Sequence, residues 1–364
     1  GCDEVGRHTP ERMRWGSQGS DPMETRMKLK VGGLACLGVG IGLSAIGCSS
    51  DSEDGGNGGN GGSGGGGNVG ECMPTAAECY ADGPTGPGAE CLAKVDNSNS
   101  DVWTGRFSYL KIDKPAALAN QLIQEVVVNK GIGLKQEACN ETGDGTFTWL
   151  IEFDSKAGKL KTGGGDPITD PKAGACFVKI PNANPVLDVK PASVDVTVDD
   201  QGKFAASVAG VTVPIFLDAE KTQVILLPLH GISFDGTFSA DHNCVGKYNG
   251  DQFSAANLCL PDTGAGETTW TTGGHLKGYI TIEEAEEVYI DTLSTSLCAQ
   301  IAGPTWKGKP DGKCSDTDAW KAGERPEGDW CSTTNSAATA DCKDAWALEA
   351  GFAASAIKIN GDCP

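Results

Sequence analysis

Cysteine offers the most distinctive chemistry in this chain of 364 residues, and one of its fifteen cysteines stands apart. Residues 27–48 read MKLKVGGLACLGVGIGLSAIGC, in which two lysines precede a glycine-rich apolar stretch and small residues precede Cys48. This order is typical of bacterial lipoprotein signal peptides, which are cut before a cysteine that is then acylated. The alternative is a buried apolar helix with an incidental cysteine. We expect Cys48 to be the lipid attachment site, through which the protein reaches the membrane.

The segments on either side of this motif indicate the domain organisation. Residues 1–26 are polar and mixed in charge, and we interpret them as a wrongly extended start with Met27 as the true initiator. Residues 27–47 are the expected signal peptide. Residues 48–70 contain the lipid-attachment cysteine and a glycine-rich, flexible tether. The rest, residues 71–364, is expected to form a disulfide-rich globular domain.

A lipid on Cys48 implies a location at the bacterial cell envelope. Ser49 follows the lipid cysteine, and in Gram-negative bacteria this resembles an outer-membrane sorting signal rather than the aspartate of an inner-membrane signal. We therefore expect an outer-membrane-anchored domain that faces the periplasm or the cell surface. Both compartments are oxidising, which allows disulfides to persist.

The remaining cysteines predict a disulfide framework. Leaving out Cys2, Cys36 and Cys48 gives an even set of twelve: Cys72, Cys79, Cys91, Cys139, Cys176, Cys244, Cys259, Cys298, Cys314, Cys331, Cys342 and Cys363. In an oxidising compartment such a set favours six disulfides. A metal site is the alternative, but the chain has no CxxC pair of the kind that structural zinc sites use. Five of the cysteines mark residues 298–364 as a candidate small subdomain.

Spacing favours two pairings in particular. Cys244 and Cys259 would close a short loop and are the best local pair. The groups at 72–91 and 298–363 contain three and five cysteines. If the four cysteines between these groups pair with one another, each outer group has one cysteine left over. We therefore expect at least one disulfide between the N-terminal and the C-terminal segments of the domain.

Three histidines follow the tether, namely His230, His242 and His275, and none belongs to a recognisable catalytic motif. No HExxH, GxSxG or phosphate-binding loop occurs in the domain. His242 lies in the sequence SADHNC, where it could bind a metal or act as a base. The favoured interpretation is a turn held by Asp and Asn side chains beside a disulfide. The sequence thus identifies no catalytic residue, metal or cofactor, and it leans against an enzyme.

A cluster of carboxylates at Glu283, Glu284, Glu286, Glu287 and Asp291 could bind calcium. The fixed spacing of oxygen ligands that an EF-hand loop requires is missing. The favoured interpretation is the solvated face of an amphipathic helix.

Seven tryptophans lie in the domain, and exposed indole rings in a secreted β-rich protein could stack on sugars. Core packing against disulfides is the favoured interpretation for the set as a whole. Trp306 and Trp320 stand in polar, turn-rich sequence and are therefore the candidate ligand surface. The ligand would be extracytoplasmic and is unknown, with carbohydrate as one candidate.

Short alternating runs predict the fold class. Phe147, Trp149, Ile151 and Phe153 alternate with less apolar residues, as in a half-buried strand. Similar strand-like runs lie at 102–113, 175–180, 193–198, 203–208, 211–217, 222–229, 232–239, 276–281 and 352–359. Helices are expected at 113–130, 282–301 and 338–350, the first two from caps at Asp113 and Thr281. We predict an α+β, β-rich domain: an antiparallel sandwich or barrel-like sheet with about three helices, stapled by disulfides.

The net charge of −20 comes without a basic cluster, which argues against a nucleic-acid partner because phosphate contacts need Lys and Arg. The segments CYADGPTGPGAECLAK, ACNETGDGTFTWLIEFD, KLKTGG, GYITIEEAE and GDWCSTTN together resemble uncharacterised secreted lipoproteins of myxobacterial type. That resemblance implies an extracytoplasmic protein and assigns no activity. We expect a non-enzymatic surface lipoprotein that binds a ligand, a polymer or an envelope partner. An extracytoplasmic hydrolase whose site forms only in three dimensions and a structural envelope or matrix component are the alternatives.

Overall fold

The computed structural model describes residues 90–120, 145–250, 269–304, 306–307 and 312–364, with short pieces between them at 82–83, 86–87, 124, 128, 132, 136–137, 140–141, 253–254 and 260–261. The signal-peptide motif with Cys48 and the tether lie outside the described residues, as do Cys72, Cys79, Cys139 and Cys259. Within the described part, the helices are all too short or too polar to cross a membrane.

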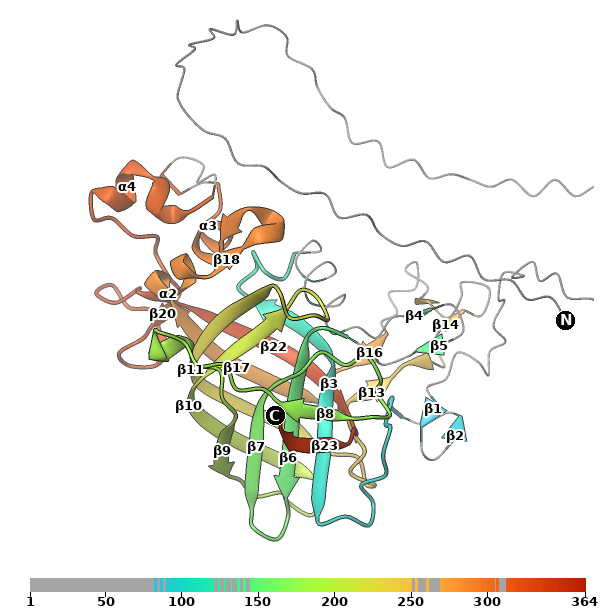
Figure 1. Cartoon of the computed structure of the whole chain (residues 1–364). Coiled ribbons are helices and arrows are strands. Elements are labelled where there is room, and N and C mark those ends of the chain that lie inside the picture. Colours follow the sequence, from blue (N-terminus) through green and yellow to red (C-terminus); the bar gives the residue numbers. More distant parts are fainter. Residues whose placement is uncertain are drawn as a thin grey trace, which may run out of the picture. The chain divides into compact units, whose positions relative to one another are not determined.

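One antiparallel sheet forms the body of the domain, with its long strands in the order β10-β11-β17-β22-β3-β6-β7 (Figure 1). These strands are β3 (Val102–Lys114), β6 (Thr148–Asp154), β7 (Lys159–Gly165), β10 (Lys203–Phe216), β11 (Val224–Thr237), β17 (Gly274–Thr281) and β22 (Ala345–Ser355). Six shorter strands join the same sheet: β8 (Ala175–Phe177), β9 (Ala192–Asp195), β12 (Cys244–Val245), β20 (Trp330–Cys331), β21 (Ser336–Ala337) and β23 (Ile359–Asp362).

The two edges of this sheet approach each other, so the sheet is barrel-like. β9 pairs with β7, and the chain after β9 returns to the start of β10 through a bridge between Val198 and Phe204. Near the C-terminal end of β10, Pro214 lies directly against Gly164 of β7. A Cβ on this glycine would come within 2.3 Å of the proline Cγ. The predicted β-rich, antiparallel, disulfide-stapled fold is confirmed in its barrel-like form.

Side chains alternate between the interior of the sheet and its outer surface. On β10, Phe204, Ala206 and Val208 are buried, whereas Ala205 and Ser207 between them are exposed. This alternation follows from the two-residue period of a strand. Burial of the inward set removes apolar surface from water, which is the main term that stabilises the sheet.

Aromatic side chains fill the end of the sheet where β3 begins and β11 ends. The ring of Trp103 lies 4.9 Å from that of Phe153 and 5.3 Å from that of Phe238, measured between centroids. Phe204 packs on Phe238 at 4.9 Å. The space inside the sheet is therefore closed at this end.

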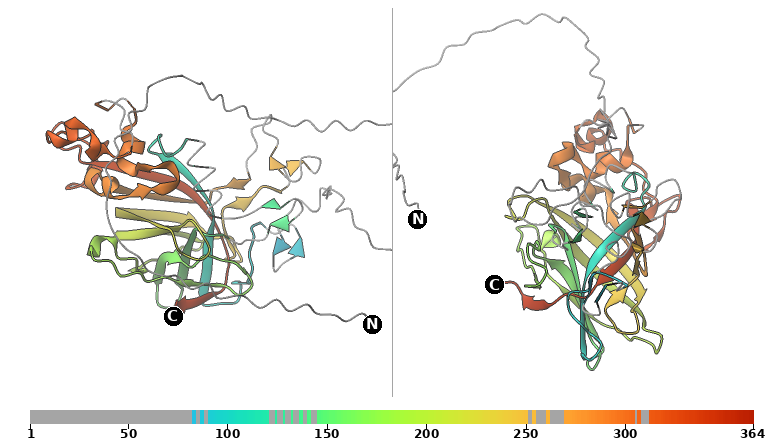
Figure 2. Two further views of the ribbon diagram at one scale, coloured as in Figure 1. Left: turned by 45° about the horizontal axis from the view of Figure 1, so that its top comes forward. Right: turned by 90° about the vertical axis from the view of Figure 1, so that its right-hand side faces the viewer.

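The helices lie in the connection between β17 and β22, at the end of the sheet opposite the β6–β7 hairpin (Figures 1 and 2). The elements of this connection are α2 (Ile282–Glu287), β18 (Tyr289–Ile290), η6 (Asp291–Leu293), β19 (Thr295–Ser296), α3 (Leu297–Ala302), η7 (Cys314–Asp316) and α4 (Asp318–Lys321), where η marks a 3₁₀ helix. The remaining elements are η3 (Pro185–Leu187) and the strand pairs β1 (Asp82–Gly83) with β2 (Gly86–Pro87), β4 (Gln136–Glu137) with β5 (Asn140–Glu141), β13 (Lys247–Tyr248) with β16 (Trp270–Thr271), and β14 (Phe253–Ser254) with β15 (Leu260–Pro261).

The predicted helix at 282–301 begins where expected but ends early. Thr281 caps α2, and its hydroxyl and backbone exchange hydrogen bonds with Glu284 in a capping box. The helix stops at Glu287, because the chain turns into the β18–β19 hairpin. A second cap at Ser296 then starts α3. Two short capped helices thus replace the long one.

The other two predicted helices are wrong in their described parts. Asp113 does not cap a helix, because β3 continues through it to Lys114 and pairs there with Glu349. Residues 121–130 of that prediction lie largely outside the described part of the chain. The predicted helix at 338–350 overlaps β22, the strand that lies between β17 and β3. Two predicted strand pairs, 203–208 with 211–217 and 222–229 with 232–239, are single long strands.

Four disulfides link the described cysteines: Cys91–Cys244, Cys176–Cys363, Cys298–Cys314 and Cys331–Cys342. The first two join residues 153 and 187 positions apart, whereas the other two close loops of 16 and 11 positions. Disulfide stapling of the domain is therefore confirmed at four bridges.

Both specific pairing predictions are wrong. Cys244 is bonded to Cys91 and not to Cys259, because β12 lies beside β22 at the edge that also receives the segment after Cys91. The predicted bridge between the two outer groups fails as well. All five cysteines from residue 298 onward bond to one another or to Cys176. The two described middle cysteines, Cys176 and Cys244, pair with Cys363 and Cys91, which contradicts the assumption of local pairing.

Candidate ligand-binding cavity

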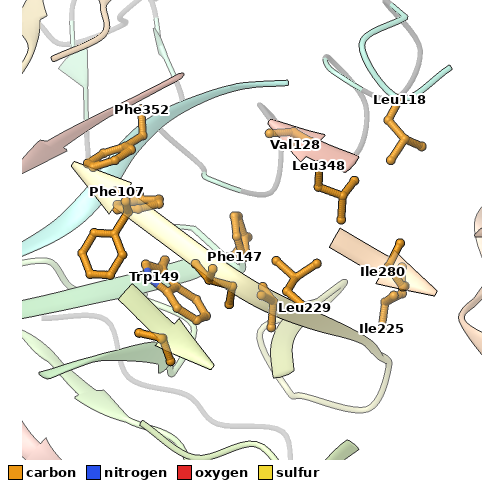
Figure 3. Close-up of a cluster of buried hydrophobic side chains, with 14 of the residues drawn as sticks. Phe107, Leu118, Val128, Phe147, Trp149, Ile225, Leu229, Ile280, Leu348 and Phe352 are labelled. Atoms are coloured by element: carbon orange, nitrogen blue, oxygen red, sulfur yellow. The ribbon is translucent and has the colours of Figure 1, made fainter. Parts of the chain in front are cut away.

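An apolar cavity of about 130 Å³ lies inside the barrel-like sheet. Figure 3 shows part of its wall, with Phe107 from β3, Leu229 from β11 and Leu348 from β22 gathered around Trp149 of β6 and Phe147, which directly precedes β6. Most of its lining is apolar and comes from β3, β6, β10, β11, β17 and β22: Phe107, Leu110, Ile112, Trp149, Val208, Val211, Val213, Ile215, Leu227, Leu229, Ile232, Phe234, Leu276, Leu348 and Ala350. Leu118, Val128 and Phe147 complete the apolar lining.

The polar side chains of the wall are few, and the buried ones are already satisfied. Thr162 lines the cavity, accepts a 2.9 Å hydrogen bond from Nε1 of Trp149 and donates one of 2.9 Å to the carbonyl of Leu150. A cavity whose polar atoms are paired offers little to water, and apolar cavities of this kind remain dry and bind apolar molecules.

Exposure varies along the cavity wall. Val213, Leu229 and Phe234 are buried, whereas other inward-facing apolar residues are only partly buried: Leu110, Ile112, Val211, Ile215, Leu227 and Leu276. Inward apolar side chains that stay partly exposed indicate unfilled space, because a well-packed core leaves few such voids. The cavity is therefore closed at the aromatic end and less well filled toward the ends of β3 and β10.

Two charged residues border the cavity, Lys114 and Glu349. Nζ of Lys114 lies 3.2 Å from Oε1 of Glu349, and Nζ of Lys277 lies 3.3 Å from the same oxygen. The side chain of Lys114 is 52% exposed, so this part of the wall meets solvent. Partial burial raises the pKa of the Glu349 carboxyl, but hydrogen bonds from Lys114 and Lys277 outweigh burial and hold the pKa below its usual value.

His230 forms a hydrogen bond with a carboxylate, which is an arrangement found in many enzyme sites. This pair does not belong to the lining of the cavity. Its Nε2 lies 2.7 Å from Oε1 of Glu284. The other oxygen of Glu284 accepts hydrogen bonds from the backbone and hydroxyl of Thr281 in the helix cap. Burial raises the pKa of Glu284, but hydrogen bonds from His230 and Thr281 outweigh it and lower the pKa overall. The pair joins β11 to α2, and neither residue belongs to the lining of the apolar cavity.

Glu284→Gln is expected to flatten the acid limb of the stability profile. Because the folded-state pKa of Glu284 lies below its ordinary value, the carboxylate stabilises the fold above about pH 4.5 and loses that contribution as pH falls through the folded pKa. Urea midpoints between about pH 3 and 7 should therefore fall less steeply for Glu284→Gln than for wild type. Glu287→Gln, on the exposed side of α2, is the control and should follow wild type; parallel profiles for Glu284→Gln and wild type would contradict the assignment.

His242 is part of a structural turn, as the favoured interpretation predicted. Its ring stacks on Trp103 with a centroid distance of 3.6 Å and an interplanar angle of 8°. Asp241 accepts hydrogen bonds from the Ser239 hydroxyl and from the backbone and side chain of Asn243. Burial is the main cause that lowers the pKa of His242. His275 is exposed on β17.

The carboxylate cluster is not uniformly a solvated helix face, because Glu286 is only 4% exposed. Its Oε2 accepts hydrogen bonds from the Ser296 hydroxyl at 2.8 Å and the Cys314 backbone at 3.0 Å. Its Oε1 accepts one from the Ser315 backbone at 2.9 Å. Glu286 therefore joins α2 to α3 and η7. Glu283 and Glu287 are exposed, as that interpretation predicted.

The two candidate ligand-surface tryptophans are neighbours. The rings of Trp306 and Trp320 meet edge to face, with centroids 6.4 Å apart and an interplanar angle of 88°. Both are partly buried and pack against the main core. The guanidinium of Arg325 lies 3.8 Å from the ring centre of Trp320 and covers one face of it. Little free stacking surface is left on Trp320, and the pair remains a prediction as a ligand surface.

Three groups of cysteine and carboxylate side chains among the described residues lie close enough to share a metal, but each contains both partners of a disulfide: Asp166 with Cys176 and Cys363, Glu286 with Cys298 and Cys314, and Asp344 with Cys331 and Cys342. Disulfide sulfurs are not the thiolates that bind metals. Their proximity is accounted for by the bridges themselves.

The chain matches no protein-family model, no curated protein and no solved structure. Its fold and interior define it as a disulfide-stapled, barrel-like antiparallel protein with an apolar cavity. The residues that line the cavity are not among those predicted from the sequence to form a site. The sequence does show that residues 211–217 and 222–229 each carry an apolar face. It does not show whether these faces pack against each other or enclose a cavity.

Proposed function

We propose that the protein is a non-enzymatic binding protein whose ligand inserts an apolar group into the cavity of the barrel-like sheet. The observation that carries this proposal is the cavity of about 130 Å³ with an almost wholly apolar lining. An engineered apolar cavity of about 150 Å³ in another protein stays dry and binds benzene, so the size suits one ring or a short hydrocarbon chain. Sheets of about eight strands that close on themselves are wide enough to hold one small ligand.

The expected cellular setting fits this role and remains part of the proposal. A lipid on Cys48 followed by the glycine-rich tether would hold the domain at the outer membrane. The motif at residues 27–48 is its support. Carbohydrate binding has less support, because Arg325 covers Trp320. A hydrolase has less support, because the His230–Glu284 pair is committed to a helix cap.

A cavity-filling variant tests the proposal. Val213→Phe places a larger side chain in the cavity and should weaken toluene binding by at least about 10-fold, because the ligand loses the apolar surface that it would bury. Titration calorimetry measures the affinity, and Val224→Phe, on the exposed start of β11, is the matched control with an expected change below about 2-fold.

Leu229→Ala enlarges the same cavity and should retain toluene binding while admitting a larger ligand such as naphthalene. Toluene binding that is absent from wild type, or that Val213→Phe leaves unchanged, would contradict the proposal. A polysaccharide that binds wild type and Val213→Phe equally well would favour the carbohydrate alternative instead.

A further inference from the structure

Within the described chain, one seam of the barrel-like sheet is not closed by a ladder of backbone hydrogen bonds. Ladders join the neighbouring long strands from β10–β11 round to β6–β7, and β9 adds to them by pairing with β7. Between β9 and β10, the described residues form only the isolated bridge of Val198 with Phe204. An open slot of about 540 Å³ lies beside this bridge, lined by residues 193–195, 205–207 and 233–235. Two strand edges therefore face each other across a gap.

The ladder between β10 and β11 decides which backbone groups of β10 face the slot. N of Phe238 donates to O of Gly202, and in an antiparallel pair the bonded positions recur at every second residue. Ala206 is therefore bonded to β11. Ala205 and Ser207 instead direct their N–H and C=O groups away from β11 and into the slot that they line.

The same reasoning applies to β9. N of Val196 donates to O of Gly158, which extends the β7–β9 ladder by one bonded position. Ser193 and Asp195 lie an odd number of residues from Val196, so their N–H and C=O groups point away from β7 and toward β10. These two residues line the slot together with the two of β10, and in the described chain none of the four has a partner for these backbone groups.

The slot lacks the residues with which proteins commonly block an exposed strand edge. Unpaired N–H and C=O groups along an edge form a template on which another chain can pair, and lysine, proline or a covering segment usually prevents this. The lining of the slot contains neither lysine nor proline. Most of its outward side chains are short, namely Ser193, Ala205, Ser207 and Ser233. The free edges of β9 and β10 are therefore open to a further strand.

We propose that the slot is a docking site for an extended peptide segment of a partner protein, which pairs through its backbone with the free edges of β10 and β9. In this mode of recognition main-chain hydrogen bonds supply the affinity, and alternate side chains supply the selectivity. The inference is independent of the apolar cavity, because the recognition groups are backbone atoms at the seam.

The two faces of the slot define the chemistry of the partner segment. Side chains on one face of a docked strand would meet Val194, Ala206 and Phe234, which belong to the apolar interior. Side chains on the other face would meet solvent beside Asp235, whose carboxylate forms no ion pair within the described chain. We therefore expect a segment that alternates apolar with polar residues and carries basic groups, which the net charge of −20 would also attract.

A short synthetic peptide of alternating valine and threonine, with a lysine at each end, is the probe. Fluorescence anisotropy of a labelled copy measures its affinity for the purified protein. The same peptide N-methylated at every second residue keeps its side chains but loses donors on one edge. It should bind at least about 10-fold more weakly, because each lost backbone hydrogen bond is worth about 5-fold.

Two variants at one position separate the backbone of the protein from its side chains. Ser207→Pro removes the N–H that faces the slot and should weaken peptide binding about 5-fold, with little loss of stability, because a strand edge tolerates proline. Ser207→Val keeps that N–H and is the matched control, with an expected change below about 2-fold.

Amide hydrogen exchange, followed by NMR, needs no variant. In the protein alone, the amides of Ala205 and Ser207 should exchange much faster than that of Ala206, since only Ala206 is bonded within the sheet. Saturation with the peptide should slow the two fast amides by at least about 10-fold.

Four outcomes would overturn the inference. The peptide fails to bind, the plain and N-methylated peptides bind equally, or Ser207→Pro leaves the affinity unchanged. In the fourth, the amides of Ala205 and Ser207 are already protected in the protein alone, because another segment of this chain or a second copy pairs with the edge. The toluene titrations test the cavity separately, so this inference and the proposed function can fail independently.

Discussion

Replacing Cys176 and Cys363 together by alanine is expected to lower the free energy of unfolding by about 5 kcal/mol. The bridge joins residues 187 positions apart, so its loss releases a long loop in the unfolded chain. In the native state it fastens β8 to β23, where the chain also forms parallel strand pairing and a hydrogen bond from Cys363 N to Phe177 O. Guanidinium unfolding of the purified, oxidised variant measures the change.

A short-loop disulfide provides the comparison. Cys331 and Cys342 are 11 positions apart, and replacing both by alanine should cost about 3 kcal/mol on the same loop-closure argument. The sharper test is the difference between the two double variants in the free energy of unfolding that each loses. Equal losses would mean that native contacts near the bridges decide the effect and not the entropy of the unfolded chain.

Glu286→Ala is expected to destabilise the domain by about 3–4 kcal/mol, because it leaves two buried donors and one partly buried donor without an acceptor. Those donors are the hydroxyl of Ser296 and the backbone N–H groups of Cys314 and Ser315. Glu286→Gln keeps one acceptor oxygen but turns an N–H group toward the remaining donors, so its loss should be about half as large. Urea unfolding followed by tryptophan fluorescence measures both.

The matched control lies next to it on α2. Glu287 is exposed, and Glu287→Ala should change the free energy of unfolding by less than about 0.5 kcal/mol. The sequence presents these two glutamates alike, and only their environments differ. If Glu286→Ala costs no more than Glu287→Ala, the hydrogen bonds to Glu286 do not contribute to stability.

The segment AWALEAGFAAS shows how tertiary contacts override local preference. Its alanines favour a helix by less than about 1 kcal/mol each, and the sequence accordingly predicts a helix at 338–350. The structure has β22 there, because Trp346, Leu348 and Phe352 alternate toward the interior and bury more apolar surface as a strand. The sequence does contain this alternation of large apolar residues with a period of two. The high alanine content of the segment nevertheless favours the prediction of a helix.

The small residues of β22 face a second layer of chain. A Cβ on Gly328 would lie 1.9 Å from the carbonyl oxygen of Ala345, so the segment before β20 lies tightly against the start of this strand. A Cβ on Gly351 would lie 3.1 Å from the side chain of Thr272, which is a tight but less severe contact. Alanine and glycine on the outer side of β22 are therefore explained by close approach of the backbone, which a single sequence cannot reveal.

The sequence by itself determined the β-rich, antiparallel class, individual strands such as β6, the cap at Thr281 and the presence of disulfides, because these depend on the local period of two, on capping chemistry and on cysteine parity. Only the tertiary structure decided which cysteines meet, which glutamate is buried and that the faces of β10 and β11 enclose a cavity beside Lys114. The physical reason is that local patterns report which face of an element is apolar. Whether two apolar faces fill the space between them depends on how far the sheet curves before its edges meet.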